Sequence, residues 1–314
     1  MSRFDWLMAT LIPIRHLPML SKAFLNWHEL AFFRLGIKHK IKLKLRNGKS
    51  VRVKSPKEYT KIMETVPYIW SACLDGLGFS ANNNLACIRK FGRRICTAYD
   101  NDADLANASK AFMEIFLNDA YGDLDIAGKV VLDVGANIGD SALYFAAKGA
   151  KRIFAYEPYP RACRLASTNA RINGFQNIKV VNAGMSGHSR SVMLEPKRVS
   201  SRADAVVPSP KGKRVGIITL EQAVATHGIT NGVLKLDCEG EEYGIILGCS
   251  RKTLRAFSQI AVEYHKGYAD IARKLSAAGF RVKHTMPEKM WNPSSDRADL
   301  YVGMIFADRI GKAR

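Results

Sequence analysis

The segment VLKLDCEGEEY, residues 233–243, places acidic side chains directly after an apolar stretch. Asp237 follows the apolar run, and Glu239 comes two residues later. Carboxylates at the end of a buried strand can take a proton from a reacting group or bind a cation. The segment is therefore a candidate site for acid–base chemistry.

A second apolar stretch, AVEYH at residues 261–265, ends in a histidine. Side chains alternate between the two faces of a strand, so Glu263 and His265 share one face. If both strands end at the same edge of a sheet, we expect these two side chains to meet the acids of the first segment. With an ordinary pKa of about 6.5, His265 is the natural general base. Asp237 or Glu239 would orient it or take the proton directly, which makes Asp237, Glu239 and His265 the catalytic candidates.

The same acids also fit a purely structural interpretation. Lys235 lies inside the apolar strand and needs a partner, and Asp237 on the same face is the nearest candidate in the sequence. Glu239 can cap the following helix. Glu241 and Glu242 fit the solvated first turn of that helix, where acids interact favourably with the helix dipole.

Metal assistance is a further alternative, because two carboxylates and an imidazole are suitable ligands for a divalent ion. The six cysteines, in contrast, show no CxxC pair and no spacing typical of zinc ligands. We therefore assign no residue to a metal on sequence grounds and leave metal assistance open.

The elements that must position these side chains form a regular series in the second half of the chain. Short apolar runs, most of them separated by helical patterns, occur at residues 130–134, 152–156, 178–182, 233–238 and 259–264. This alternation indicates an α/β fold with a parallel sheet and helices on both faces. Runs at 280–284 and 300–306 are expected to add closing edge strands. Residues 186–214, rich in Ser, Pro, Gly and basic side chains, predict a hairpin with a mobile tip.

The segment VVLDVGANIGDSALYFAAKGA, residues 130–150, has the order strand, glycine-containing loop, helix. Ligands of open α/β sheets bind at the carboxyl ends of the strands, where such a loop allows close approach of the backbone. The dinucleotide fingerprint G-x-G-x-x-G is absent, and no Gly-Lys-Ser/Thr follows, which excludes a P-loop.

Two acids narrow the choice of ligand. Asp133 lies inside the strand just before the loop, and Glu157 ends the next strand, where a carboxylate can accept hydrogen bonds from two ribose hydroxyls. An acid beside the loop would repel a pyrophosphate but suits a ligand with ammonium and sulfonium charges. S-Adenosylmethionine is such a ligand. In the structural alternative, Asp140 caps the helix and Asp133 only supports the strand.

Together these segments resemble the FkbM family of S-adenosylmethionine-dependent methyltransferases over roughly residues 112–306. The similarity rests on four motifs: the D-x-G-A-N-x-G loop, the Y-E-P turn, the ING helix end and K-x-D-x-E-G-x-E. It implies a Rossmann-like, seven-stranded class I methyltransferase sheet and, for most of the family, methylation of a hydroxyl oxygen.

The resemblance also implies roles for individual residues. Asp133, Gly135 and Asn137 would line the methionine end of the cofactor, in the loop that Gly139 completes. Glu157 would bind the ribose, and the pair Asn182-Ala183 would flank the adenine.

The first 110 residues fit the family pattern poorly, and we interpret them as a basic extension that precedes a methyltransferase domain at 111–314. The chain has 48 Lys and Arg against 28 Asp and Glu, a net charge of +20, and residues 1–54 hold twelve of these basic residues but only two acids. Residues 21–36 predict a helix with Ser21 as N-cap. Residues 41–54 predict a hairpin turning at Asn47-Gly48, with Lys and Arg on its outer face.

The sequence also predicts the compartment of the protein and the state of its cysteines. The N-terminus lacks the pattern of a signal peptide, and no stretch has the roughly 18–20 uncharged apolar residues that cross a bilayer. Unpaired thiols would favour a reducing compartment, so we expect a cytoplasmic protein. The basic extension could dock on an anionic membrane to reach a lipid-linked sugar.

The leading hypothesis from sequence is O-methylation of a hydroxyl on a small molecule, glycan or lipid-linked sugar. RNA methylation is an alternative suggested by the positive charge, although the hairpin at 41–54 has no aromatic side chain on which a base could stack. A non-catalytic binding protein on a methyltransferase scaffold is a third, because fold does not determine function.

Overall fold

The computed structural model describes residues 24–34, 36–44, 50–55, 74–196, 209–290 and 300–311. These residues form two compact units, one up to Asp119 and the other from Ala120 onward. The division therefore follows Asp119, whereas the sequence places the boundary at residue 110.

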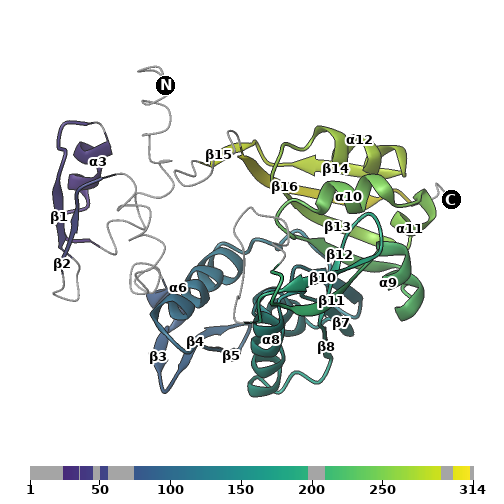
Figure 1. The fold of residues 1–314 in the computed structure, drawn as a ribbon, viewed down its shortest axis with the longest axis horizontal. Coiled ribbons are helices and arrows are strands. Elements are labelled where there is room, and N and C mark those ends of the chain that lie inside the picture. The colour runs from purple at the N-terminus through teal and green to yellow at the C-terminus, as the bar shows by residue number, and fades with distance from the viewer. Residues whose placement is uncertain are drawn as a thin grey trace. The chain divides into compact units, whose positions relative to one another are not determined.

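The first unit begins with a short helix and a two-stranded hairpin (Figure 1). These elements are α3 (His28–Arg34), β1 (Ile41–Lys44) and β2 (Ser50–Val53). The two strands are antiparallel, which confirms the predicted hairpin. Along β1 the two apolar residues are buried and the two lysines are exposed, so the outer face is basic as predicted. The Asn47-Gly48 turn and the predicted N-cap Ser21 lie outside the described residues.

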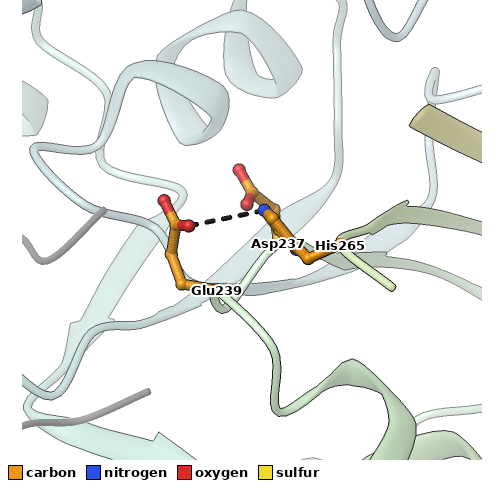
Figure 2. A group of neighbouring side chains, drawn as sticks. All are labelled: Asp237, Glu239 and His265. Atoms are coloured by element: carbon orange, nitrogen blue, oxygen red, sulfur yellow. Dashed lines mark ion pairs between the residues drawn. The ribbon is translucent and has the colours of Figure 1, made fainter. Parts of the chain in front are cut away.

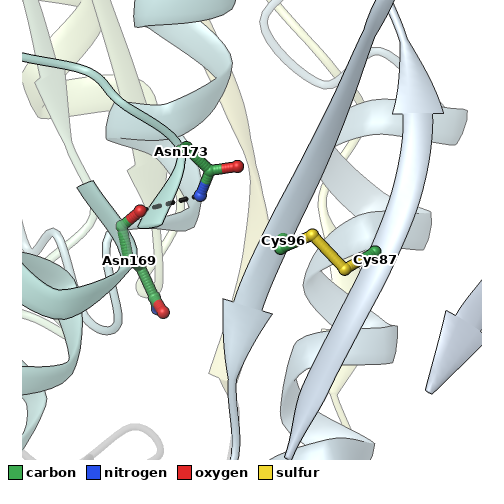
Figure 3. Close-up of a disulfide and its surroundings, with 4 residues drawn as sticks. All are labelled: Cys87, Cys96, Asn169 and Asn173. Carbon is green, nitrogen blue, oxygen red and sulfur yellow. Dashed lines mark hydrogen bonds between the residues drawn. A yellow bond between two sulfur atoms is a disulfide. The ribbon is translucent and has the colours of Figure 1, made fainter. Parts of the chain in front are cut away.

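A second hairpin in this unit carries a disulfide. A 3-10 helix η2 (Asp75–Leu77) precedes the antiparallel strands β3 (Ser80–Asn82), β4 (Leu85–Lys90) and β5 (Arg93–Ala98). Cys87 and Cys96 are direct partners across β4 and β5, with their Cα atoms 4.1 Å apart, and Figure 3 shows the bond between them.

The disulfide corrects the expectation of unpaired thiols. Disulfides persist in oxidising surroundings, so the cysteine pattern no longer favours a reducing compartment. The sequence gives no sign of the pairing, because the spacing matches no disulfide or metal motif and only the strand register brings the two residues together.

The first unit ends in two consecutive helical segments, α6 (Asp102–Ala111) and the π-helix η3 (Phe112–Leu117). Asn101 caps α6, because its side chain accepts a hydrogen bond from the backbone N–H of Asp104.

The second unit is built on a mixed sheet of seven strands (Figure 1). The strands are β6 (Val130–Val134), β7 (Arg152–Tyr156), β8 (Ile178–Val181), β12 (Gly232–Leu236), β13 (Phe257–Tyr264), β14 (Phe280–His284) and β16 (Leu300–Arg309). Their order is β14-β16-β13-β12-β6-β7-β8, and the short strand β15 (Glu288–Met290) pairs with β16. This is the predicted Rossmann-like α/β fold.

The sheet departs from the sequence prediction at one edge. The pairs from β13 to β8 are parallel, but β16 runs antiparallel to both of its neighbours. It lies between β13 and β14, so only β14 is a closing edge strand. β14 and β16 are consecutive in the main sheet order and pair antiparallel, and such a pair needs no crossover helix.

Helices cover both faces of the sheet. They are α7 (Asp140–Ala147), α8 (Pro160–Ile172), α9 (Leu220–His227), α10 (Glu242–Gly248), α11 (Arg251–Leu254) and α12 (Ala269–Ala277). Leu132, Val134, Leu234 and Leu236 share one core cluster with residues from α9 to α12. The residues that alternate with them face the other side of the sheet, toward α7.

A smaller sheet follows β8. It contains β9 (Ala183–Met185), β10 (Arg190–Leu194) and β11 (Lys213–Ile218) in the order β10-β11-β9. β10 and β11 are antiparallel, which confirms the hairpin predicted between residues 186 and 214. The tip of that hairpin, residues 197–208, lies outside the described residues.

None of the helices in the described part of the chain has the length and apolar character needed to cross a lipid bilayer.

The loop after β6 depends on two glycines. Gly135 has a φ of +79°, and a Cβ there would lie 1.7 Å from the carbonyl oxygen of Asp237. Gly139 has a φ of +87°, and a Cβ there would lie 3.1 Å from the Cα of Ala166 in α8. The first glycine lets the β6 loop pack against the end of β12, and the second lets it pack against α8.

We predict that Gly135→Ala destabilises the protein. The substitution adds a left-handed backbone penalty and a clash with backbone, together on the order of 2–5 kcal/mol in the free energy of unfolding. Urea unfolding of the purified protein measures this change. Gly216→Ala is the matched control, because Gly216 is exposed on β11 and a Cβ there meets nothing within 4 Å. Equal stability of the two variants would contradict the close approach at Gly135.

Candidate active site

A pocket opens in the second unit where β6, β7, β9 and β12 end. Its empty volume is about 660 Å³, including space open to solvent. It is lined by Val134, Gly135, Asn137, Tyr156, Glu157, Pro158, Tyr159, Gly184, Met185, Asp237, Cys238, Glu239 and Glu241. Five of the predicted site residues therefore face one cavity: Gly135, Asn137, Glu157, Asp237 and Glu239.

Glu157 is held in place by the backbone. Its Oε2 accepts a hydrogen bond from the N–H of Asn137 at 2.9 Å, and its Oε1 accepts one from the N–H of Tyr159 at 2.8 Å. Burial raises the pKa of Glu157 to about 8, although the two N–H donors act in the opposite direction. Each carboxylate oxygen keeps a lone pair for a hydroxyl of a ligand in the pocket.

Asn137 presents an unsatisfied polar atom in the same wall. Its backbone has a φ of +46°, a conformation that asparagine tolerates better than most residues. Its side-chain Oδ1 is buried and has no hydrogen-bond partner within the described structure. A buried acceptor without a donor is costly, so this atom is suited to a donor group of a bound ligand.

Three other predicted cofactor residues support the pocket without lining it. Gly139 packs against Ala166, as described above. The Asn182 side chain donates hydrogen bonds to the backbone carbonyls of Glu157 and Pro158, at 3.0 and 2.9 Å. Ala183 begins β9, and the next two residues of that strand form the pocket wall.

Asp133 is also absent from the pocket wall, because it belongs to a buried ion pair. Its Oδ1 lies 3.2 Å from Lys235 Nζ, its Oδ2 accepts a hydrogen bond from Ser141 Oγ, and both charged side chains are almost fully buried. Lys235 Nζ also donates a hydrogen bond to the carbonyl oxygen of Gly135 at 2.7 Å. This corrects the expectation that Asp237 is the principal partner of Lys235, since the Asp237 carboxylate is farther away at 3.7 Å.

Three side chains converge beyond the ends of β12 and β13, and these are the three catalytic candidates (Figure 2). Suitable ligand atoms of Asp237, Glu239 and His265 all lie within 4.8 Å of one another. His265 Nε2 is 3.4 Å from Glu239 Oε2. The fourth side chain expected here, Glu263, is neither in this group nor in the pocket wall.

Glu239 has an unusual backbone. Its φ is +58°, which is uncommon for a residue other than glycine. The N-cap position of α10 belongs to Glu241, so Glu239 does not cap that helix as the structural alternative suggested. Such conformations persist where the surrounding structure holds them, frequently at functional sites.

Glu242 corrects the prediction of a solvated first turn. The residue is fully buried, and its two carboxylate oxygens accept hydrogen bonds from the N–H groups of Cys238 and Gly240, at 2.7 and 2.8 Å. Its Oε1 also lies 3.4 Å from His265 Nδ1. The contact with His265 is an ion pair, because Nδ1 has no hydrogen bond of acceptable geometry within the described residues.

This arrangement controls the protonation of His265. Burial lowers the pKa of the imidazole, but the neighbouring carboxylate of Glu242 and the charges of Asp237 and Glu239 outweigh it and raise the pKa to about 9. His265 therefore carries a proton at neutral pH and cannot act as a free base there. Of the roles considered from sequence, direct proton removal by Asp237 or Glu239 fits this charge state better.

Glu241 is not solvated either. Its carboxylate accepts a hydrogen bond from Ser186 Oγ at 2.7 Å and one from the Arg190 guanidinium at 3.2 Å. Because Arg190 begins β10, this network joins the pocket wall to the small sheet. The sequence places Glu241 and Arg190 far apart, so only the fold brings them together.

Other residues of the site were also missed from sequence. Glu242 could have been found, because Ile245 and Ile246, three and four positions later, put it on the buried face of its helix. Cys238 lines the pocket, but burial raises the pKa of its thiol well above the usual range, which makes it a poor nucleophile. Tyr159 contributes through its backbone N–H, for which no sequence signal exists.

The β6 loop and the acids after β12 lie in a part of the chain that matches one family. Residues 133–282 match the family described as Methyltransferase FkbM domain. This part of the chain is an FkbM methyltransferase domain. Asp133 and the motif from Lys235 to Glu242 lie within the matched region, so both walls of the pocket belong to this FkbM domain.

Two curated proteins match shorter stretches. An uncharacterized protein of Sulfolobus islandicus filamentous virus is 55% identical over 38 residues, which is 12% of this chain. An uncharacterized RNA methyltransferase of Oceanobacillus iheyensis is 31% identical over 105 residues, which is 33% of this chain. The matches span only 24% and 22% of those proteins. A solved S-adenosylmethionine-dependent methyltransferase from Agrobacterium tumefaciens is 10% identical, with a TM-score of 0.40 over 73% of this chain and 71% of that one.

We predict that Lys235→Met strongly destabilises the FkbM domain. Removing one partner of a buried ion pair leaves the other charge uncompensated, at a cost of about 3–5 kcal/mol in the free energy of unfolding. Adding Asp133→Asn should recover part of this loss, since a neutral amide does not need an ammonium partner. Chemical unfolding of both variants and the wild type measures the change. A single-variant cost below about 1 kcal/mol, typical of exposed pairs, would show that the pair is not desolvated.

Proposed function

We propose that this protein is an S-adenosylmethionine-dependent methyltransferase that transfers a methyl group to a hydroxyl oxygen. The observation that carries the proposal is the division of the pocket into two walls. One wall offers hydrogen-bond acceptors suited to a nucleoside, and the other offers the carboxylates of Asp237 and Glu239. The acceptor class, a small molecule, a glycan or a lipid-linked sugar, is part of the proposal.

The residues of the first wall fit the cofactor. Glu157 is fixed by two backbone N–H groups and can accept hydrogen bonds from ribose hydroxyls. The orphaned Oδ1 of Asn137 can accept from the amino group at the methionine end. Gly184 and Met185 give an apolar surface at the end of β9, where a planar base can lie. When bound, S-adenosylmethionine supplies an electrophilic methyl group on a positively charged sulfur.

The residues of the second wall manage the proton of the acceptor. A hydroxyl is a weak nucleophile until it is deprotonated, and a positioned base contributes roughly a hundred- to ten-thousandfold to the rate. Asp237 and Glu239 line the pocket and are partly exposed, so either carboxylate can reach an acceptor hydroxyl. The protonated His265 lies against Glu239 and stabilises its negative charge.

We predict that the wild type binds S-adenosylmethionine in the micromolar range and that Glu157→Ala weakens binding. Removing this acceptor leaves ligand hydroxyls without a partner in the pocket, at a cost of about 1–3 kcal/mol, which corresponds to roughly 5- to 150-fold in affinity. Isothermal titration calorimetry measures both proteins. Glu157→Gln, which keeps the shape but has a single acceptor oxygen, should lie between them.

Asp123→Ala is the matched control, because Asp123 is exposed and outside the pocket. NAD serves as the control ligand and should not bind. Absence of S-adenosylmethionine binding by the folded wild type would overturn the proposal. Release of S-adenosylhomocysteine with hydroxyl compounds, but not with their methoxy counterparts, is the result expected for transfer to oxygen.

RNA methylation is the second candidate, and the β4–β5 hairpin favours it. The register places Arg89 opposite Arg94 and Lys90 opposite Arg93, although like charges facing each other destabilise a hairpin. Phe91 at the turn is 38% exposed, and Lys90 Nζ lies 5.5 Å from its ring centroid. An aromatic ring among cations is the kind of platform on which bases of single-stranded RNA stack.

If RNA is the acceptor, Phe91→Ala should reduce the affinity for labelled single-stranded RNA roughly tenfold, because base–aromatic stacking contributes about 1–3 kcal/mol. Fluorescence anisotropy at several salt concentrations measures affinity and its salt dependence. Lys42→Gln on the β1–β2 hairpin, which is basic but lacks an aromatic residue, is the matched control. Unchanged affinity in Phe91→Ala, or no binding by the wild type, would remove this candidate.

A further inference from the structure

The group formed by Asp237, Glu239 and His265 has the donor set of a metal site. Two carboxylate oxygens and one imidazole nitrogen can come from three side chains whose ligand atoms lie within 4.8 Å of one another. Metal–ligand bonds of about 2.0–2.2 Å require ligand atoms somewhat closer than this. Asp237 and Glu239 are partly exposed, at 28% and 33%, so small side-chain rotations can close the set.

The surroundings of His265 provide an independent indication. The imidazole is buried, with 7% of its side chain exposed, and its Nε2 edge is turned toward Glu239. Its other nitrogen, Nδ1, faces the carboxylate of Glu242 at 3.4 Å and has no hydrogen bond among the described residues. A metal-binding histidine typically has a carboxylate or carbonyl at its second nitrogen, which fixes the ring and makes the ligand nitrogen more basic.

Glu242 is itself fixed, which makes the arrangement rigid. Its two oxygens accept hydrogen bonds from the N–H groups of Cys238 and Gly240, on either side of Glu239. Glu242 therefore lies against the imidazole and also holds the loop that carries the Glu239 carboxylate. A salt bridge formed only to neutralise a surface acid would not need Glu242 and its two backbone hydrogen bonds.

The local balance of charge also favours a cation. Asp237, Glu239 and Glu242 supply three carboxylates around one imidazole. Lys235 lies closer to Asp133 than to Asp237, and its ammonium donates to the Gly135 carbonyl. A divalent cation at Nε2 would displace the proton that His265 carries and add one further positive charge against these three carboxylates.

We infer that Asp237, Glu239 and His265 form a binding site for a divalent cation, with Glu242 as the positioning residue behind His265. Carboxylate oxygens suit Mg²⁺ and Mn²⁺, and Mn²⁺ also accepts an imidazole nitrogen, so Mn²⁺ is the appropriate probe. Three protein ligands leave coordination positions open toward the pocket that Asp237 and Glu239 line. At such a position a bound hydroxyl loses its proton more readily, a role that rests on the proposed function.

The test is titration of tag-free, metal-stripped protein with Mn²⁺, followed by the electron paramagnetic resonance signal of the free ion. We expect one site in the wild type, and at least tenfold weaker affinity in Asp237→Asn, Glu239→Gln and His265→Asn. Asp123→Asn, an exposed acid outside the group, is the matched control and should bind as the wild type does. Pulsed measurements should detect a nitrogen nucleus coupled to the bound Mn²⁺, and this coupling should disappear in His265→Asn.

Two results would overturn the inference: no Mn²⁺ binding by the wild type up to millimolar concentration, or binding that the three variants leave unchanged. Circular dichroism and thermal unfolding show whether each variant is folded, and Glu239→Gln, at the most exposed of the three side chains, is the variant least expected to unfold. The same samples are titrated with S-adenosylmethionine. Cofactor binding without Mn²⁺ binding contradicts only the cation site, whereas the reverse contradicts only the proposed function.

Discussion

The ion pair between Lys235 and Asp133 is the interaction on which the candidate site depends. It joins the centres of β12 and β6, two neighbouring strands that the chain separates by about a hundred residues. The same ammonium group reaches past the end of β6 to the carbonyl of Gly135. One buried cation thus fixes the strand that carries Asp237 relative to the loop that carries Asn137, and the two walls of the pocket keep their separation.

A second layer of buried polar contacts extends this constraint. Glu157 is tied to the β6 loop by the Asn137 N–H, and Glu242 is tied to the loop after β12 by two N–H groups. Both carboxylates use backbone donors, which do not depend on side-chain rotamers. The acids of the site are therefore organised by local main-chain geometry, while the large positive charge of the chain lies mostly elsewhere, including the outer faces of the two hairpins in the first unit.

Much of this arrangement follows from the sequence. The apolar runs predict the strands because β12 and its parallel neighbours are buried on both faces and must be continuous in hydrophobicity. The loop glycines and Glu157 can be identified from the sequence, because each lies at the end of a predicted strand, where ligands of such sheets bind. The partner of Lys235 is not found, because Asp237 is near in sequence but Asp133 is nearer across the sheet. The charge state of His265 is not predicted either, because it depends on Glu242. The burial of Glu242 follows only from its place on the apolar face of its helix. The pairing of Cys87 with Cys96 requires the register of β4 and β5, which their spacing alone does not give.

The antiparallel strand β16 affects how the sheet can be assembled. It occupies the position between β13 and β14, and it is the last strand of the described chain. During synthesis, β13 and β14 therefore have no shared hydrogen-bonding neighbour until residues 300–309 become available. The edge of β13 that pairs with β16 stays unpaired through that interval. The geometry around His265, whose carbonyl accepts a hydrogen bond from the Tyr301 N–H, is therefore completed late, after β6, β7 and their helices have been made.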